Sequence, residues 1–138
     1  MDLAHGFEIE DPAVVVPWNA TEDEVRHLLS VITVTRGYLT ADVMSLHGLR
    51  HGIGFHFYPR ASGRLVELEF FRRNYPDSKA SFEEFQHHLE ATFGPPKETG
   101  EGDYAGLPWS RWSVGGAEIR HLVMDRFGPE EHVRITRS

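Results

Sequence analysis

The chain of 138 residues contains no cysteine. This absence excludes disulfide bonds, thiolate nucleophiles and cysteine-ligated zinc sites, and it fits a reducing compartment. Long apolar runs are also absent, since no segment approaches the roughly 20 apolar residues that a bilayer-spanning helix needs. Residues 1–10 carry acidic side chains and no basic region, so we expect no signal peptide. These features predict a cytoplasmic protein without membrane contact, and the length fits a single domain over residues 1–138.

Basic side chains are outnumbered, with 14 Lys and Arg against 21 Asp and Glu, which gives a formal net charge of -7. Binding of nucleic acid depends mainly on neutralising phosphates. The acidic balance therefore argues against a nucleic-acid partner. A protein partner with a basic surface fits the charge better, because complementary fields speed association.

Catalytic motifs are missing as well. The sequence has no Gly-x-Ser-x-Gly nucleophile motif, no phosphate-binding glycine loop and no dinucleotide fingerprint. The carboxylates are numerous but scattered. The sequence therefore predicts a protein that is not an enzyme and that holds no cofactor.

The first half of the chain alternates between strand and helix signals. Alternation predicts strands at 7–10 and 14–16. Thr21 is a good N-cap with Glu24 three residues later, which predicts a helix that Gly37 closes. The segment 38–47 fits either a strand or a short helix, and we favour the strand. The apolar stripe of the expected helix consists of Val25, Leu28, Leu29 and Ile32.

The second half begins with the clearest hairpin, in which residues 53–58 and 66–71 alternate between apolar and polar side chains. Ser81 and Glu84 then predict the start of a helix that stops at Gly94. Residues 97–108 contain little that is apolar and predict a surface loop. The last three expected strands lie at 109–114, 117–124 and 132–136, and the first two flank the turn Gly115-Gly116.

This order of elements predicts an α+β fold. We expect one antiparallel sheet with both helices packed on one face. Each helix opens with a similar capping box and leads into a block of three antiparallel strands. The order therefore suggests a duplicated αβββ unit.

Nine histidines raise the question of a metal site. On the second expected helix, Glu83 and His87 share one side, and Glu84 and His88 share the next, because each pair is four residues apart. Such pairs can hold a divalent ion, but they are also ordinary features of a solvated helix, which is the interpretation that we favour. His121 shares a strand face with Ile119 and Val123 and is expected to be a hydrogen-bonded core residue.

Two groups of side chains are candidates for partner contact. In the predicted hairpin, His56, Tyr58, Glu67 and Glu69 gather on the face opposite the apolar residues. That face either binds a partner or is the plain polar side of a half-buried sheet. The second group is Tyr104, Trp109 and Trp112. The two tryptophans are an odd number of residues apart, so they face opposite sides of their strand, and exposed tryptophan is favoured in binding hot spots.

The chain resembles small bacterial α+β proteins, among them immunity proteins that neutralise toxins. The resemblance covers roughly the C-terminal half and depends on the helix end Phe93-Gly94-Pro95-Pro96, the Trp109-x-x-Trp112 strand and the closing hairpin from Arg126 to Ile135. It implies a cytoplasmic binding protein without a catalytic centre. We therefore expect a protein-binding module of the immunity type. The alternatives are a secretion or folding chaperone and a metal-dependent enzyme that uses His87 and His88.

Overall fold

The computed structural model describes residues 1–59, 63–72 and 77–137. The described chain has two helices and ten strands. The helices are α1 (Glu22–Leu28) and α2 (Ser78–Phe93). The strands are β1 (Gly6–Ile9), β2 (Val14–Pro17), β3 (Ile32–Thr35), β4 (Tyr38–Ser45), β5 (Leu49–Tyr58), β6 (Arg64–Phe71), β7 (Glu98–Gly100), β8 (Trp109–Val114), β9 (Ala117–Asp125) and β10 (Pro129–Arg137).

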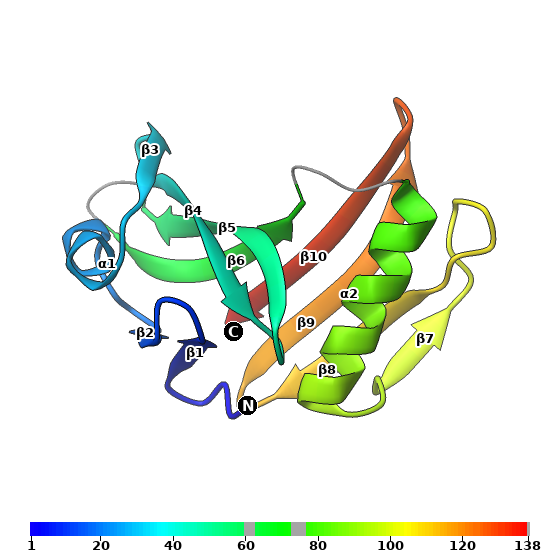
Figure 1. The fold of residues 1–138 in the computed structure, drawn as a ribbon, viewed down its shortest axis with the longest axis horizontal. Coiled ribbons are helices and arrows are strands. Elements are labelled where there is room, and N and C mark those ends of the chain that lie inside the picture. Colours follow the sequence, from blue (N-terminus) through cyan, green and yellow to red (C-terminus); the bar gives the residue numbers. More distant parts are fainter. Residues whose placement is uncertain (60–62, 73–76, 138) are drawn as a thin grey trace.

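Eight of these strands form one antiparallel sheet in the order β3-β4-β5-β6-β10-β9-β8-β7. Both halves follow the same plan, in which a helix precedes four strands joined by consecutive hairpins, and the two last strands, β6 and β10, meet in the middle (Figure 1). The predicted α+β class is therefore confirmed. The suggested repeat contains four strands, one more than expected, because both edge strands were missed.

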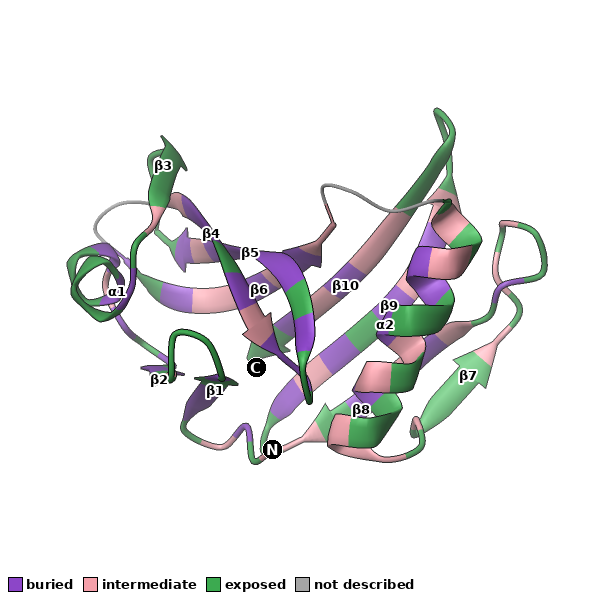
Figure 2. Cartoon of the chain, in the orientation of Figure 1, coloured by how far each residue is buried: buried purple, intermediate pink, exposed green. Residues whose placement is uncertain are grey.

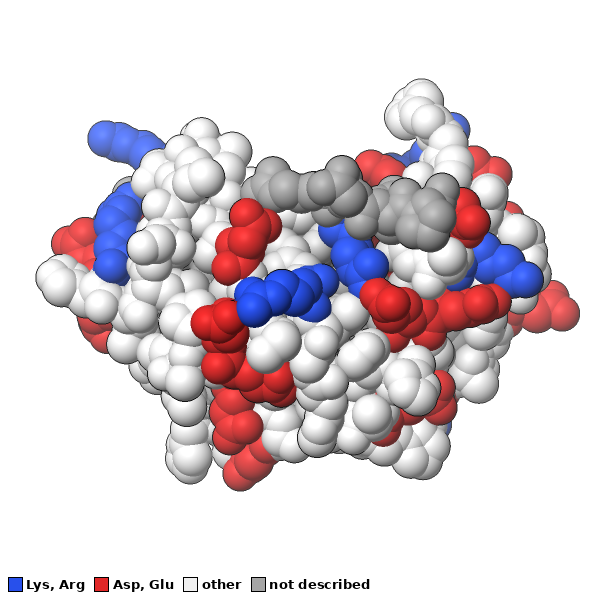
Figure 3. Space-filling view, viewed as in Figure 1, with Lys and Arg blue, Asp and Glu red and all other residues white. Residues whose placement is uncertain are grey.

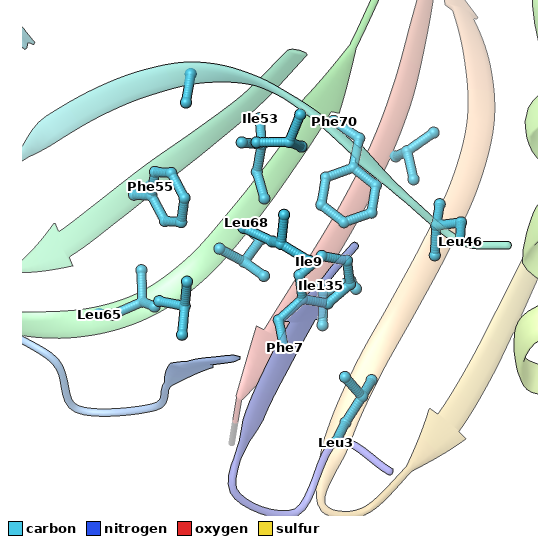
Figure 4. Close-up of a cluster of buried hydrophobic side chains, with 14 of the residues drawn as sticks. Leu3, Phe7, Ile9, Leu46, Ile53, Phe55, Leu65, Leu68, Phe70 and Ile135 are labelled. Carbon is cyan, nitrogen blue, oxygen red and sulfur yellow. The ribbon is translucent and has the colours of Figure 1, made fainter. Parts of the chain in front are cut away.

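The core lies on one side of the sheet, which we call the inner face. There α2 crosses β9 and β10, while the β1–β2 hairpin covers the other half (Figure 1). Phe7 packs against Phe70 with ring centroids 5.2 Å apart and the ring planes tilted by 55°, and apolar side chains from β5, β6 and β10 surround them (Figure 4). Both helices bury side chains in this cluster, through Val25 of α1 and through Phe85 and Leu89 of α2.

Helix α1 is shorter than the sequence pattern predicts. Its N-cap is confirmed, because the hydroxyl of Thr21 accepts a hydrogen bond from the backbone N–H of Glu24. The helix ends at Leu28, however, and residues 32–35 form the edge strand β3, in which Ile32 is 65% exposed. β-Branched residues lose rotamer freedom in a helix and fit a strand, and here that preference outweighs the helical spacing.

The segment 38–47, whose sequence fits either a strand or a short helix, contains strand β4, which is the alternative that we favoured. The next hairpin, β5–β6, is also confirmed, but it contains a bulge. His56 pairs with Glu67, whereas Phe57 pairs with Leu65, so Val66 is an extra residue. The bulge makes Leu65 the core residue and leaves Val66 only half-buried.

Helix α2 starts earlier than predicted. Asp77 is the N-cap, and its carboxylate accepts a hydrogen bond from the N–H of Ala80 at 2.7 Å. Ser81 is instead buried and donates its hydroxyl proton to Glu131. The predicted stop at Gly94 is confirmed, with a φ of 82° that favours glycine. The region expected to be one surface loop, 97–108, contains the short edge strand β7.

Candidate protein-binding face

The side of the sheet away from α2 is here called the outer face. Alternation along each strand sends one set of side chains inward and the next set outward, as the banding along β9 and β10 shows (Figure 2). Outward residues from β5 to β7 are half-buried or exposed, apart from Gly52 and Gly54, whereas most of their inward neighbours are buried. Outward side chains that carry charge or aromatic rings include Tyr38, His56, Glu67, Glu69, Glu98, Trp109, Arg111, Glu118, Arg120, His132 and Arg134.

An arginine row crosses the centre of this face. Arg134 of β10 pairs in register with Arg120 of β9, which pairs in turn with Arg111 of β8. Acidic residues end the row, because Glu69 of β6 pairs with Arg134 and Glu98 of β7 pairs with Arg111. Directly opposed residues in a sheet lie about 5 Å apart at Cβ, so the register alone places three arginines next to one another.

At one end of the row, the carboxylate of Glu69 contacts three other side chains. It accepts a hydrogen bond from the hydroxyl of Tyr38 at 2.9 Å and pairs with Arg134 at 3.0 Å. His56 stacks on Tyr38 and brings Nε2 to 3.5 Å from the carboxylate. The contact with His56 is the largest influence that lowers the pKa of Glu69, to about 2, and the Tyr38 and Arg134 contacts add to it against the opposing effect of burial. Glu69 therefore stays ionised at neutral pH.

At the other end, Arg111 is held by two carboxylates. It binds Glu98 through Nε and Nη2, and its Nε lies 3.8 Å from Glu118. The hydrogen bond from Arg111 lowers the pKa of Glu98, and Glu98 raises the pKa of Arg111. Arg120 shares Glu118 with Arg111, since its Nε donates to the same carboxylate oxygen at 3.1 Å.

Two hollows lie along the row. One of about 520 Å³ is lined by Trp109, Leu122 and the charged residues around Arg111 and Arg120. The other, of about 280 Å³, lies between Arg120, Arg134 and His132. The outer face is thus a polar surface with preformed depressions rather than a flat sheet.

The structure brings part of the predicted contact set together. His56, Glu67 and Glu69 lie on the outer face within one ion-paired group, since Arg134 also pairs with Glu67 at 3.3 Å. Tyr58 is 75% exposed at the end of β5. The arginine row was missed, because it depends on which strands pair and in which register.

The tryptophan group needs a correction. Trp109 and Trp112 do face opposite sides, as predicted. Trp109 is half-buried on the outer face, but Trp112 is only 2% exposed and donates its ring N–H to the carbonyl of Gly94. Tyr104 packs on the inner side against Phe82. Neither Trp112 nor Tyr104 can therefore share a contact surface with Trp109.

A third depression lies on the inner side, between α2 and the β4–β5 hairpin. It has a volume of about 570 Å³ and is lined by His51, Arg72, Glu84 and His88 among others. Basic side chains lie near the middle of this side of the molecule, with acidic side chains on either side of them (Figure 3). Arg72 pairs with Glu84 and lies over the ring of Phe85, and burial lowers its pKa. The groups in this cleft therefore largely neutralise one another.

Two histidines of the inner face are buried. His51 contacts Ser45 Oγ through Nε2 and the Gly52 carbonyl through Nδ1, and burial lowers its pKa to about 4. His121 is fully buried, as predicted, with Nδ1 2.7 Å from Gln86 Oε1 and Nε2 2.6 Å from Glu131. Gln86 Oε1 and the Glu131 carboxylate are both hydrogen-bond acceptors, so each ring nitrogen of His121 faces an acceptor.

The described residues offer no set of ligands for the metal site that the histidines suggested. Among the described residues, no group of three His, Asp or Glu side chains is placed to hold a metal ion. His88 contacts the carbonyl of Leu46 through Nδ1 at 2.8 Å, and its ring meets that of His87 edge-on. Neither helix of the described chain is long and apolar enough to cross a membrane.

Comparison with known proteins gives one distant similarity. No protein-family model matches the chain, and no curated protein sequence matches it. The chain is similar to the crystal structure of a DUF4309 family protein (YjgB) from Bacillus subtilis, with a TM-score of 0.44 and 13% sequence identity. The similarity covers 86% of this chain and 79% of that one. It says nothing about what this chain binds.

Proposed function

We propose that the chain is a small cytoplasmic protein-binding module that contacts its partner through the outer face, and that it belongs to the immunity type that inhibits a toxin. The observation that carries the proposal is the ion-paired, hollowed surface from β5 to β7, over which no described helix packs. Its groups are already held in place by neighbours. Preorganised side chains lose less entropy on association, which favours binding.

The residue types on this face also fit partner contact. Arginine, tyrosine and tryptophan dominate binding hot spots, and the outer face presents the row of arginines together with Tyr38 and Trp109. The overall charge of -7 suits a partner with a basic surface. A toxin that acts on nucleic acid or on another polyanion would present such a surface.

The test is capture of the partner from the lysate of the native organism with three tagged chains. These are the wild type, Arg120→Glu on the outer face and Lys79→Glu on α2. Both variants reverse one exposed positive charge, since the Arg120 side chain is 63% exposed and that of Lys79 is 67% exposed. We expect one stoichiometric partner with the wild type and Lys79→Glu and its loss with Arg120→Glu. Purified partner should also lose its activity in the presence of the wild type.

Two outcomes would count against the proposal. A blank with the wild type would contradict a stable partner, and equal capture by all three chains would contradict the outer face. Capture with no effect on the partner's activity would contradict the inhibitor assignment alone.

A second candidate, a secretion or folding chaperone, has one specific feature in its favour. Edge strand β3 is exposed along its whole length, and Ile32 and Val34 are 65% and 56% exposed. An uncharged apolar edge is a template for pairing with another extended chain. A chaperone of this kind would be a dimer. Light scattering that finds only the monomer at roughly 0.1–1 mM, where weakly associating proteins pair, would therefore exclude it.

A further inference from the structure

We infer that the outer face receives a carboxylate of the partner at Arg120, in the hollow that Trp109 and Leu122 border. This inference rests on the proposed function and names the chemistry at the centre of the contact. The partner would present a basic surface with one Asp, Glu or chain-terminal carboxylate at its middle.

The first argument is the arginine row itself. Like charges directly opposite each other destabilise a sheet, yet Arg134, Arg120 and Arg111 follow one another across three adjacent strands. The outer two are compensated, because Arg134 has Glu67 and Glu69 while Arg111 has Glu98 and a longer contact with Glu118. Among the described residues, Arg120 between them pairs with Glu118 alone.

The second argument is the set of donors that Arg120 leaves open. Its guanidinium carries five N–H donors, and only Nε is used, in the bond to Glu118. Within the described residues, Nη1 and Nη2 have no acceptor, and 63% of the side chain is exposed. A planar pair of N–H groups matches a carboxylate in bidentate geometry, so the free edge of Arg120 has the shape of a carboxylate site.

The third argument is the wall of the hollow. Trp109 lies over Gly100, where an added Cβ would be only 2.6 Å from the ring nitrogen. Glycine at this position therefore lets the indole lie close against β7. Leu122 lines the same hollow. An apolar wall beside a guanidinium fits a carboxylate on a short aliphatic stem better than a bare inorganic anion, and partial exclusion of water would strengthen the charged hydrogen bonds.

The surrounding acids define what else the partner must carry. Glu98 and Glu118 line the hollow with Arg111 and Arg120, so a segment with several carboxylates would be repelled. A single carboxylate of the partner would pair with the arginine row, and lysines or arginines on either side of it would pair with the acidic residues at the ends of the row. Repulsion of the wrong partner is a common source of specificity.

The probe is a pair of capped pentapeptides, acetyl-Lys-Lys-Glu-Lys-Lys-amide and the same peptide with Gln for Glu. Binding is followed by NMR at the Arg120 Nε–H and at the ring N–H of Trp109, against which the more deeply buried Trp18 and Trp112 serve as internal references. We expect the Glu peptide to shift both signals saturably and to bind at least fivefold more tightly than the Gln peptide. Equal binding of the two peptides, or no shift with either, would overturn the inference.

Three variants of the chain separate the carboxylate site from general electrostatics. Arg120→Gln should abolish the preference for the Glu peptide, and Arg120→Lys should lose most of it, because lysine keeps the charge without the planar fork. Lys79→Gln is the matched control and should bind both peptides as the wild type does. Preference that survives Arg120→Gln would contradict the site.

The captured partner separates this inference from the proposed function. We expect Arg120→Gln to weaken the partner at least tenfold, while Lys79→Gln leaves its affinity unchanged. If Arg120→Gln binds as the wild type does but Arg120→Glu does not, the outer face contacts the partner and the carboxylate site is wrong. If the wild type captures nothing, the proposed function fails, and the peptide measurement still decides whether Arg120 binds a carboxylate.

Discussion

On the inner face of the sheet, the side chain of His121 is fully buried and its Nε2 lies 2.6 Å from Glu131. On the outer face, His56 is 30% exposed and its Nε2 lies 3.5 Å from Glu69. Both are histidine–glutamate pairs on neighbouring strands of one sheet, but the glutamate side chain is 11% exposed in the first pair and 23% exposed in the second. The difference indicates that the inner pairs stabilise the fold, whereas the outer pairs contribute little stability and remain available for contact.

The largest effect should come from breaking the inner pair. Glu131→Ala leaves Nε2 of His121 and the Ser81 hydroxyl without their acceptor at a site that is almost closed to water, which should lower the free energy of unfolding by about 1–3 kcal/mol for each of the two groups. Urea unfolding at pH 7 measures this change. Glu130→Ala is the matched control, because the Glu130 side chain is 64% exposed and only approaches His132 at 3.7 Å, so it should cost less than about 1 kcal/mol. Equal costs for the two variants would show that burial does not separate the faces.

The second effect concerns His51, a neutral histidine of the inner face. Its pKa is about 4 in the folded chain against 6.5 in the unfolded chain, because burial disfavours the charged ring. The unfolded chain then binds the extra proton between these values, so stability should fall by about 3 kcal/mol as the pH drops from 6.5 to 4.

The quantity to compare is the slope of stability against pH in the wild type and in His51→Gln, because the difference between the two slopes isolates the contribution of this side chain. The variant should be less stable at pH 7 but should lose less stability on acidification. Parallel curves for the two chains would contradict the assignment to His51.

The smallest effect belongs to the outer face. The pKa of Glu69 is about 2 in the folded chain against 4.5 ordinarily, so its stabilising contribution is present above pH 4.5 and is lost as the pH falls toward 2. Because the site is partly exposed, solvent screening should limit the contribution to about 1 kcal/mol. Urea midpoints of the wild type and Glu69→Gln should differ at pH 6 and converge near pH 2. A cost of several kcal/mol at pH 6 would place Glu69 with the inner pairs.

Much of this fold could be predicted from local patterns. Alternation correctly placed Ile119, His121 and Val123 on the inner face and His56, Glu67 and Glu69 on the outer one. The stop at Gly94 needed only one residue of positive φ after a helix. These features depend on neighbours along the chain, which a sequence displays directly.

Features that depend on distant neighbours could not be predicted. Residues 32–35 form a strand because β4 is there to pair with them, even though Ile32 continues the helical spacing of α1. Asp77 caps α2 while Ser81 binds Glu131, and both residues are good caps on their own. The arginine row requires the register between β8, β9 and β10, and its end at Glu69 requires β6 to lie beside β10.

The meeting of β6 and β10 has a consequence for how the chain folds. Among the described strands of the large sheet, every other pairing joins strands that follow one another in the chain, whereas this one joins Phe70 to Val133. Local hairpins form quickly, but closing a long loop costs entropy before its contacts are gained. The two four-stranded halves can therefore form early, and the pairing of β6 with β10 is then the slow step of folding.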